Sequence, residues 1–387
     1  MNKKLVVPGM VFFLWGSVTA INSTLVLFFH QYFKISWQEA ILINVLFYLA
    51  PFIACLPCSA LISRWGYRTV LRISLAVTAL GCLALALALQ GYSFSCSLLA
   101  VFVVAIGVSA MQVVANPYLA LLSAPHKRSG NLSLASAMNS VGTTLGPLFV
   151  AFLLQRNPVN LAAHQEPISQ LWLALALFSG LLILISFAVK LPDVERPLRL
   201  NQRVLELWKY KCFVFSVIAI FCYVGVEVSL ATSVVNYLST IGLWEMDQAM
   251  SLVAIYWGGA LAGRLLFGFF AHKLNIYHSF LFATLFCSLC VMLAIFFNNG
   301  IGGVLLLLTG LGNAIMYPVI FSRSIKEISH LANIAAAVLV MAGIGGAIIP
   351  YLQAVIIDEI GLRISFILPM VLYFILVMWG YFQLRDD

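Results

Sequence analysis

The stretch KLPDVERPLRLNQRVLELWKYK, residues 190–211, is the longest polar segment of the chain and holds six of its cationic residues. On both sides of it the sequence consists of apolar runs, each close to the length of about 20 residues that a helix needs to cross a bilayer. Six such runs precede the segment and six follow it. The sequence therefore predicts two six-helix bundles, 1–189 and 212–387, joined by a central cytoplasmic loop at 190–211.

The composition excludes a soluble globular class. Of the 387 residues, 63% are hydrophobic and 9% are charged, against about 45–50% and about 25% in ordinary globular domains. Lipid cannot satisfy backbone amides, so spanning elements are helices or closed barrels, and the runs lack the period-two alternation of barrel strands. We expect an all-α membrane protein with twelve spans, near 8–30, 39–62, 70–90, 95–122, 130–154, 170–189, 212–238, 249–271, 279–297, 302–321, 332–356 and 363–384.

The distribution of lysine and arginine predicts the orientation. With the N-terminus inside, 17 of these residues fall on the cytoplasmic side and only Lys34, Arg156 and Arg363 fall outside. This is a strong positive-inside bias, so both termini are expected in the cytoplasm. The net charge of +8 then reflects topology and contact with anionic lipid, and no nucleic-acid partner is expected.

Two cysteine pairs, in CLPC (Cys55, Cys58) and CSLC (Cys287, Cys290), have the spacing of zinc ligands. Both pairs lie inside apolar helices without a histidine nearby in sequence. Small polarisable side chains of this kind pack well between helices. We therefore expect no metal site and no cofactor.

The two halves repeat each other's features. SVGTTLGPLF (140–149) in the first half and GIGGAIIPYL (343–352) in the second both carry a glycine followed five residues later by proline, and ANPYLA (115–120) is answered by MYPVIF (316–321). Two six-helix repeats around a central loop are typical of major facilitator transporters, which bind substrate at the repeat interface near the bilayer midplane.

A short loop signature of that superfamily is present in degraded form. SALISRWGYR (59–68) keeps Arg64, Gly66 and Arg68, but has Ser59 and Ser63 where glycine and aspartate would stand. We assign Arg64 and Arg68 to gating at the cytoplasmic side.

Amide side chains interrupt the apolar stretch GVSAMQVVANPYLALL, residues 107–122. Gln112 and Asn116 are four residues apart and so share one helix face, which is expected to turn inward, where hydrogen-bonding partners exist. Pro117 removes a backbone hydrogen bond and loosens the helix. The stretch predicts a cavity lining with a bend.

Other predicted helices carry similar polar residues. Amides, hydroxyls and aromatic rings are what a sugar requires, because its hydroxyls need paired donors and acceptors and its C–H faces pack on rings. The alternative is helix-to-helix hydrogen bonding, at about 0.6 kcal/mol per contact. The candidate substrate-binding set is Asn22, Gln112, Asn116, Asn139, Asn313, Tyr317 and Gln353.

Glu227 and Arg264 are the ionisable residues, cysteine and tyrosine aside, that lie clearly within predicted spans. A charge at the centre of a membrane helix costs about 3 kcal/mol on insertion scales, so each needs a reason. Glu227 lies 16 residues beyond Lys211, about 24 Å along a helix. Burial disfavours its charged form, which suits a carrier that takes up and releases a proton or cation; a substrate contact and a structural acid are the alternatives. Arg264 is assigned to gating, paired with Glu327.

The combined placement of several short motifs resembles the fucose/galactose/glucose:proton symporter family of major facilitators. These motifs are FFLWG (12–16) with Asn22 after it, ANPY (115–118), NSVG (139–142), YVGVE (223–227), GR (263–264) and MYPVIFSRSIK (316–326). The resemblance covers most of the chain. It implies a monosaccharide transporter, in a bacterial inner membrane, that works by alternating access.

The resemblance also implies residue roles. Asn139 and Tyr317 match positions that line the family's sugar site, Asn22 and Asn116 match recurrent asparagines, and Glu227 matches the acid of glucose/galactose-type members. Fucose-type members have acids tied to proton coupling where this sequence has Ser23 and Gln112. Gln112 keeps the shape of glutamate but cannot carry a proton. The sequence leaves the coupling of transport open between proton symport, sodium symport and uncoupled facilitation.

Three other functions compete with sugar import. Efflux of a drug or siderophore-like metabolite predicts an apolar cavity, and a sensor with this fold predicts ligand binding without transport. A membrane enzyme would need a clustered nucleophile and base, and the six histidines all fall near helix ends, so we expect no enzyme. By analogy with major facilitators we expect a monomer.

Overall fold

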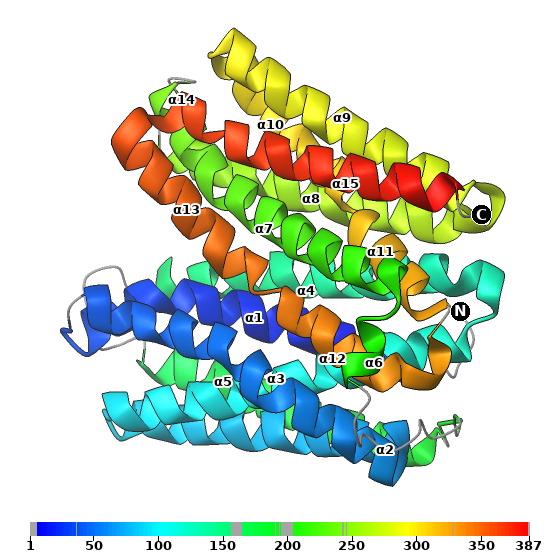
Figure 1. The fold of residues 1–387 in the computed structure, drawn as a ribbon. Coiled ribbons are helices and arrows are strands. Elements are labelled where there is room, and N and C mark those ends of the chain that lie inside the picture. The colour runs from blue at the N-terminus through cyan, green and yellow to red at the C-terminus, as the bar shows by residue number, and fades with distance from the viewer. Residues whose placement is uncertain are drawn as a thin grey trace. The chain divides into compact units, whose positions relative to one another are not determined.

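The computed structural model describes residues 6–35, 37–155, 165–189, 191–192, 194, 204–241, 244, 246–326 and 328–385. Nearly all of them are helical, as Figure 1 shows, and no strand occurs among them. The helices are α1 (Val6–Tyr32), α2 (Trp37–Gln90), α3 (Phe94–Leu122), α4 (Arg128–Gln155), α5 (Gln165–Ala188), α6 (Val204–Leu207), α7 (Lys211–Thr240), α8 (Met246–Phe270), α9 (Ile276–Phe297), α10 (Gly300–Asn313), α11 (Met316–Lys326), α12 (Ala332–Ala342), α13 (Gly345–Ile360), α14 (Leu362–Ser365) and α15 (Ile367–Arg385). Short 3₁₀ turns at Pro125–Lys127, Ala271–Lys273 and Ser329–Leu331 precede α4, follow α8 and precede α12.

The predicted spans all fall on these helices. Nine stretches in the described part of the chain are long and apolar enough to cross a membrane, and Val6–Asn22 is a shorter apolar helix. The second and third predicted spans both lie in α2, the tenth is divided between α10 and α11, and the eleventh between α12 and α13. Of the remaining spans, the twelfth begins on the short α14 and continues in α15, and each of the others corresponds to one long helix.

The predicted loop after the second span is a corner at a single residue. Gly66 has φ 79° and ψ 164°, while the residues on either side of it stay helical. Glycine adopts such a positive φ without the steric cost that a side chain would add. The chain can therefore leave one span and enter the next almost without a linker.

Proline and glycine explain the two divided spans. Pro318 has no N–H to donate to the Ala314 carbonyl, and the helix is interrupted by a turn at 314–315. Asn313 thus ends α10 while Tyr317 belongs to α11, so the two do not lie on one continuous helix. The second interruption lies at 343–344, in the glycine-rich GIGG.

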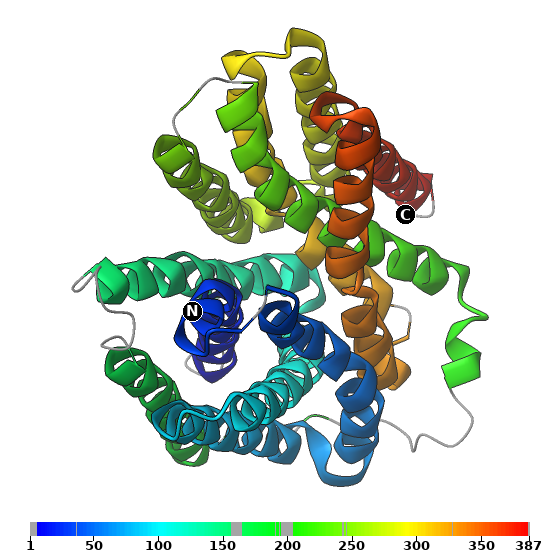
Figure 2. The ribbon, with the colours of Figure 1, turned by 90° about the vertical axis from the view of Figure 1, so that its left-hand side faces the viewer.

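The described chain forms two compact units. The first comprises residues 1–122, 138–201 and 330–340, and the second 123–137, 202–329 and 341–387. Most of each predicted half thus falls in one unit, but the first part of α4 packs with the second unit and most of α12 with the first. Figure 2 shows the orange α12 beside the blue α2, where Asn333 Nδ2 donates to the Ser59 carbonyl and the Ser63 hydroxyl, both at 2.9 Å.

Glycines allow close helix packing at equivalent places in the two units. In the first, a Cβ at Gly142 of α4 would overlap the Phe13 carbonyl of α1, and in the second, a Cβ at Gly345 of α13 would overlap the Phe221 carbonyl of α7. Figure 1 shows α7 and α13 running side by side. The glycine motifs that suggested a repeat in the sequence therefore serve the same packing role in each half.

Candidate functional site

A buried ion pair lies at the centre of the second unit. Arg264 Nη2 of α8 lies 2.9 Å from Glu227 Oε1 of α7, and the two side chains are 8% and 14% exposed. The same nitrogen lies 3.4 Å from the Tyr223 hydroxyl, one turn before Glu227. The two charges that the sequence placed within spans are thus partners, and each compensates the cost of burying the other.

Further hydrogen bonds connect this pair to two other helices, α10 and α15. The Tyr256 hydroxyl of α8 donates to the Glu227 backbone carbonyl at 3.0 Å and accepts from Asn313 Nδ2 at 2.9 Å. The Tyr373 hydroxyl of α15 donates to Asn313 Oδ1 at 2.7 Å. Both ends of the Asn313 amide are therefore engaged inside the protein, and Asn313 is fully buried.

The start of α4 touches the helix that carries Arg264. Ser133 Oγ donates to the Arg264 backbone carbonyl at 2.7 Å, and the Ser129 and Ser322 hydroxyls lie 2.6 Å apart. Helices α4 and α8 also pack closely, because a Cβ at Gly268 would meet the Leu134 side chain. The backbone of Arg264 is thus hydrogen-bonded to the first part of α4.

Two more candidate residues of the second unit differ in exposure. Gln353 is buried, accepts a short hydrogen bond from Ser229 and donates to the Ser365 hydroxyl at 3.3 Å. Tyr317 keeps part of its surface exposed and packs against the rings of Tyr223 and Phe321, with centroids 6.2 Å and 5.7 Å away. Tyr317 is thus accessible to a ligand, whereas Gln353 connects α13 to α7 and α14.

The candidates of the first unit divide in the same way. Asn22 and Asn116 are buried, while Gln112 and Asn139 are half-buried. Asn116 Nδ2 donates to the Gln112 backbone carbonyl at 2.9 Å, one turn back along α3. Asn139 Nδ2 donates to the Phe12 carbonyl of α1 at 3.2 Å. The Gln112 carbonyl neighbours that of Val113, which lacks its helical donor because Pro117 has no N–H.

The predicted gating residues have varied surroundings. Arg64 is exposed and its guanidinium lies 5.9 Å from the Trp65 ring centroid, whereas Arg68 Nη1 donates to the Leu191 carbonyl at 3.1 Å. Glu327 lies outside the described residues. The predicted Arg264–Glu327 pair is therefore not described, and the carboxylate that Arg264 contacts is that of Glu227.

Sequence reasoning missed three residues of the network around Glu227 and Arg264, namely Tyr223, Tyr256 and Tyr373, and it also missed Asn333 of the first unit. Tyr223 had a usable signal, because it stands four residues before Glu227, the same spacing that marked Gln112 and Asn116. Tyr256 and Tyr373 had none, since tyrosine in an apolar helix is also common at the membrane interface.

The cysteine pairs take part in ordinary helix packing. Cys58 Sγ lies 3.6 Å from the Ala110 carbonyl and Cys287 Sγ 3.4 Å from the Thr309 carbonyl. In the described part of the chain no group of three or more His, Cys, Asp or Glu side chains could hold a metal ion.

Comparison with known proteins identifies the family. The model of the Major Facilitator Superfamily matches residues 9–338. The chain belongs to this superfamily. It is a transporter rather than an enzyme, and the expected fold of twelve transmembrane helices in two six-helix bundles is confirmed.

Two relatives and one solved structure refine this assignment. The glucose/galactose transporter of Brucella abortus is 32% identical over 378 residues, covering 96% of this chain and 92% of that protein. The L-fucose-proton symporter of Haemophilus influenzae is 25% identical over 422 residues, covering 98% and 97%. The crystal structure of the Escherichia coli fucose:proton symporter matches with a TM-score of 0.86 at 20% identity, covering 98% of both chains. This major facilitator therefore falls in the fucose/galactose/glucose:proton symporter family, as its motifs predicted.

Proposed function

We propose that this major facilitator imports a monosaccharide of the glucose or galactose type by alternating access. The observation that carries the proposal is its 32% identity, over 96% of the chain, to a glucose/galactose transporter. The fucose symporter of Haemophilus influenzae is more distant at 25%. Fucose is therefore the less favoured substrate, and glucose and galactose are the first to test.

Partial exposure favours three polar residues as sugar contacts. In the first unit, Gln112 and Asn139 keep part of their surface accessible and offer amide donors and acceptors. In the second unit, Tyr317 keeps part of its surface accessible and offers an aromatic ring. Asn22, Asn116, Asn313 and Gln353 are buried. We propose that these four position the helices that carry the contacts. Asn313 and Gln353 do so through interhelical hydrogen bonds, and Asn116 through a bond within α3.

We further propose that Glu227 couples transport to the proton gradient. Ser23 and Gln112 cannot serve in place of the acids of fucose-type members. Proton uptake by Glu227 would remove the negative charge that holds Arg264. Arg264 would then need other acceptors, and its backbone bond to Ser133 offers a way for that change to reach α4. Sodium coupling and uncoupled facilitation are the alternative outcomes.

The proposal places the protein in a bacterial inner membrane as a monomer with both termini in the cytoplasm. The charge distribution supports this orientation. Arg64, Arg68, Arg264 and Glu327 are proposed to control access from the cytoplasmic side.

Uptake by intact cells tests the direction of transport and the substrate class together. The protein would be expressed in a bacterial strain that lacks its own glucose and galactose uptake systems, and labelled sugar would be measured inside the cells. We expect saturable accumulation of galactose or glucose above an empty-vector control. Lower internal sugar or drug levels than the control would instead indicate efflux.

A further inference from the structure

Two cavities of the second unit meet at the corner between α8 and α9. Leu274 and Asn275 line both of them. One cavity, of about 350 Å³, is bounded by polar and cationic residues, and the other, of about 840 Å³, is bounded mainly by apolar ones. A molecule that reached both would need a charged part and an apolar part joined by a short connection.

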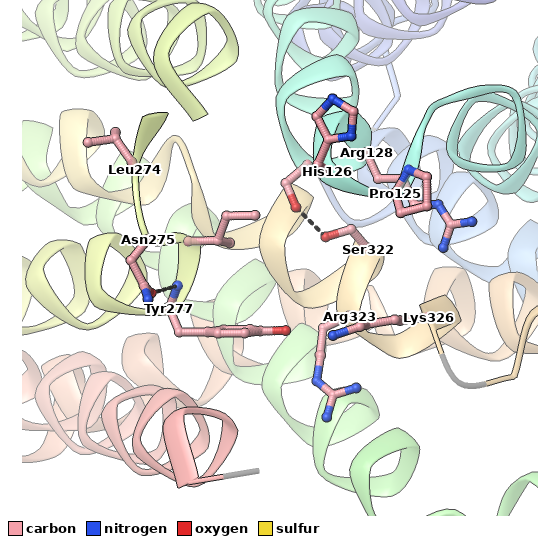
Figure 3. A pocket seen from close by; sticks show the side chains of 11 residues that line it. Pro125, His126, Arg128, Leu274, Asn275, Tyr277, Ser322, Arg323 and Lys326 are labelled. Carbon is pink, nitrogen blue, oxygen red and sulfur yellow. Dashed lines mark hydrogen bonds between the residues drawn. The ribbon is translucent and has the colours of Figure 1, made fainter. Parts of the chain in front are cut away.

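The smaller cavity has the chemistry of an anion site. Arg128, Arg323 and Lys326 line it, and no aspartate or glutamate is among its described lining residues. Figure 3 shows the Tyr277 hydroxyl pointing toward Arg323 and Lys326. The Arg323 guanidinium is buried and donates through Nε to Gln383 Oε1 at 2.7 Å, which fixes its position.

Arg128 contributes an unused donor. Its Nε is buried and has no hydrogen-bond partner among the described residues. A buried donor of this kind is costly unless an acceptor reaches it. Phosphate oxygens are suitable acceptors for arginine because they match the guanidinium geometry.

The larger cavity is an apolar groove between α8 and α9. Its walls include Leu266, Phe270, Phe282 and Leu311, all of them exposed large hydrophobic residues. Lys273 is also among its lining residues. The helices that form it are membrane spans, so the groove faces the region where acyl chains are available.

We propose that the two cavities together bind one anionic phospholipid, with its phosphate in the basic cavity and an acyl chain in the apolar groove. Charge complementarity selects an anionic headgroup, and the adjoining groove selects a lipid over a soluble phosphate. Basic pockets between transmembrane helices on the cytoplasmic side are known lipid headgroup sites. The proposal does not depend on which substrate the protein carries.

Thermal unfolding in nanodiscs tests the site. The wild-type protein would be compared in discs of phosphatidylcholine alone and of phosphatidylcholine with phosphatidylglycerol. We expect the anionic lipid to raise Tm by about 2–4 °C, the size of shift that a specific ligand gives a domain of this size. The Arg128→Gln/Lys326→Gln double variant should lose this shift. A matched control, Lys209→Gln/Lys211→Gln, removes two exposed cations from outside both cavities and should keep it.

Three results would overturn the proposal. Equal loss of the Tm shift in both double variants would mean that the anionic lipid stabilises the protein through general surface electrostatics. A shift of the same size on adding inorganic phosphate or glycerol phosphate to phosphatidylcholine discs would mean a soluble anion. Failure of phosphatidylglycerol to stabilise the wild type would mean no specific site.

A second variant keeps the test decisive if the double variant does not fold. Leu266→Trp fills the groove and leaves every charge in place. By native mass spectrometry, the wild type should retain one more phosphatidylglycerol than this variant after detergent removal of loosely bound lipid. Equal retention would show that the groove holds no acyl chain and would contradict the proposal.

Discussion

At the scale of single residues, the proposed proton coupling rests on the Glu227–Arg264 pair. The pair is almost fully enclosed at 2.9 Å, and breaking such a pair by removing one charge typically costs about 3–5 kcal/mol because the other is left buried. In the proposed coupling role, loss of the Glu227 charge would leave Arg264 without this partner. A substitution of either residue is therefore expected to affect the other.

Glu227→Gln should abolish gradient-driven sugar accumulation while sparing sugar exchange at equal concentrations. Glutamine preserves the shape and hydrogen bonding of the side chain but cannot take up a proton. Accumulation and exchange would be measured in the same proteoliposomes. Wild-type accumulation in this variant would remove Glu227 from the coupling role.

The double variant Glu227→Gln/Arg264→Gln separates coupling from folding. Removing both charges leaves no unpaired charge in the buried site. The Tm of the double variant should therefore be closer to the wild-type Tm than the Tm of Glu227→Gln is, while gradient-driven accumulation stays lost. Recovery of accumulation together with Tm would indicate that the pair is only structural.

Asn139→Ala and Tyr317→Phe should each weaken sugar binding by a factor of about 5–30, the effect of losing one or two hydrogen bonds at about 1–2 kcal/mol. Tyr351→Phe is the matched control, because Tyr351 is 70% exposed and lies outside the candidate set. Ligand binding would be measured by isothermal calorimetry. Unchanged binding in both test variants would count against the proposed contacts.

The sequence predicted which helices carry polar residues. It did not predict which group each polar side chain binds. Their spacing gave Asn116 and Gln112 the same predicted role. In the structure, the Asn116 side chain donates to the Gln112 backbone carbonyl of the same helix, whereas the Gln112 side chain is half-buried. The pairing of Glu227 with Arg264 joins residues 37 positions apart. Such a contact depends on how α7 and α8 pack, and the spacing of residues within one helix gives no information about that packing.

At the scale of helices, glycine positions determine how closely spans approach. Gly142 of α4 faces the backbone of α1 so closely that a Cβ would overlap it, whereas Gly180 of α5 has no atom within 4 Å of the added Cβ. Small residues at such crossings are the usual basis of helix association in membranes. The repeated glycine motifs were visible in the sequence, while the corner at Gly66 was predicted only as a loop.

Gly142→Ala should lower Tm, because α1 and α4 must move apart to admit the methyl group. Gly180→Ala should leave Tm unchanged or raise it slightly, since alanine favours helix by about 1 kcal/mol over glycine. Both would be measured by differential scanning fluorimetry in the same detergent. Equal Tm changes in the two variants would show that Gly142 is not a packing position.

At the scale of the whole molecule, hydropathy sufficed to predict twelve spans, and the repeated motifs predicted the class of transporter. The sequence did not predict that the first part of α4 packs with the second unit and most of α12 with the first. Those contacts rest on single polar groups such as Asn333, which bonds Ser59 and Ser63 at the positions of the degraded loop signature. Local sequence composition does not indicate which residue such a polar group will bind.

The native cysteines offer a direct test of orientation. Cys96, at the start of α3, is exposed, and the predicted topology places it outside. A membrane-impermeant maleimide should label it in intact cells, and Cys96→Ser should remove that label. Labelling of Cys96 only after permeabilisation would invert the predicted topology.

The most direct test of sugar transport is uptake by the purified protein in liposomes. Labelled glucose, galactose, fucose, mannose and N-acetylglucosamine would each be supplied with no gradient, with an imposed proton gradient and with an imposed sodium gradient. The account predicts saturable uptake of galactose or glucose that the proton gradient drives above equilibrium. Absence of uptake for every sugar, in liposomes where the protein is shown to be folded, would contradict it.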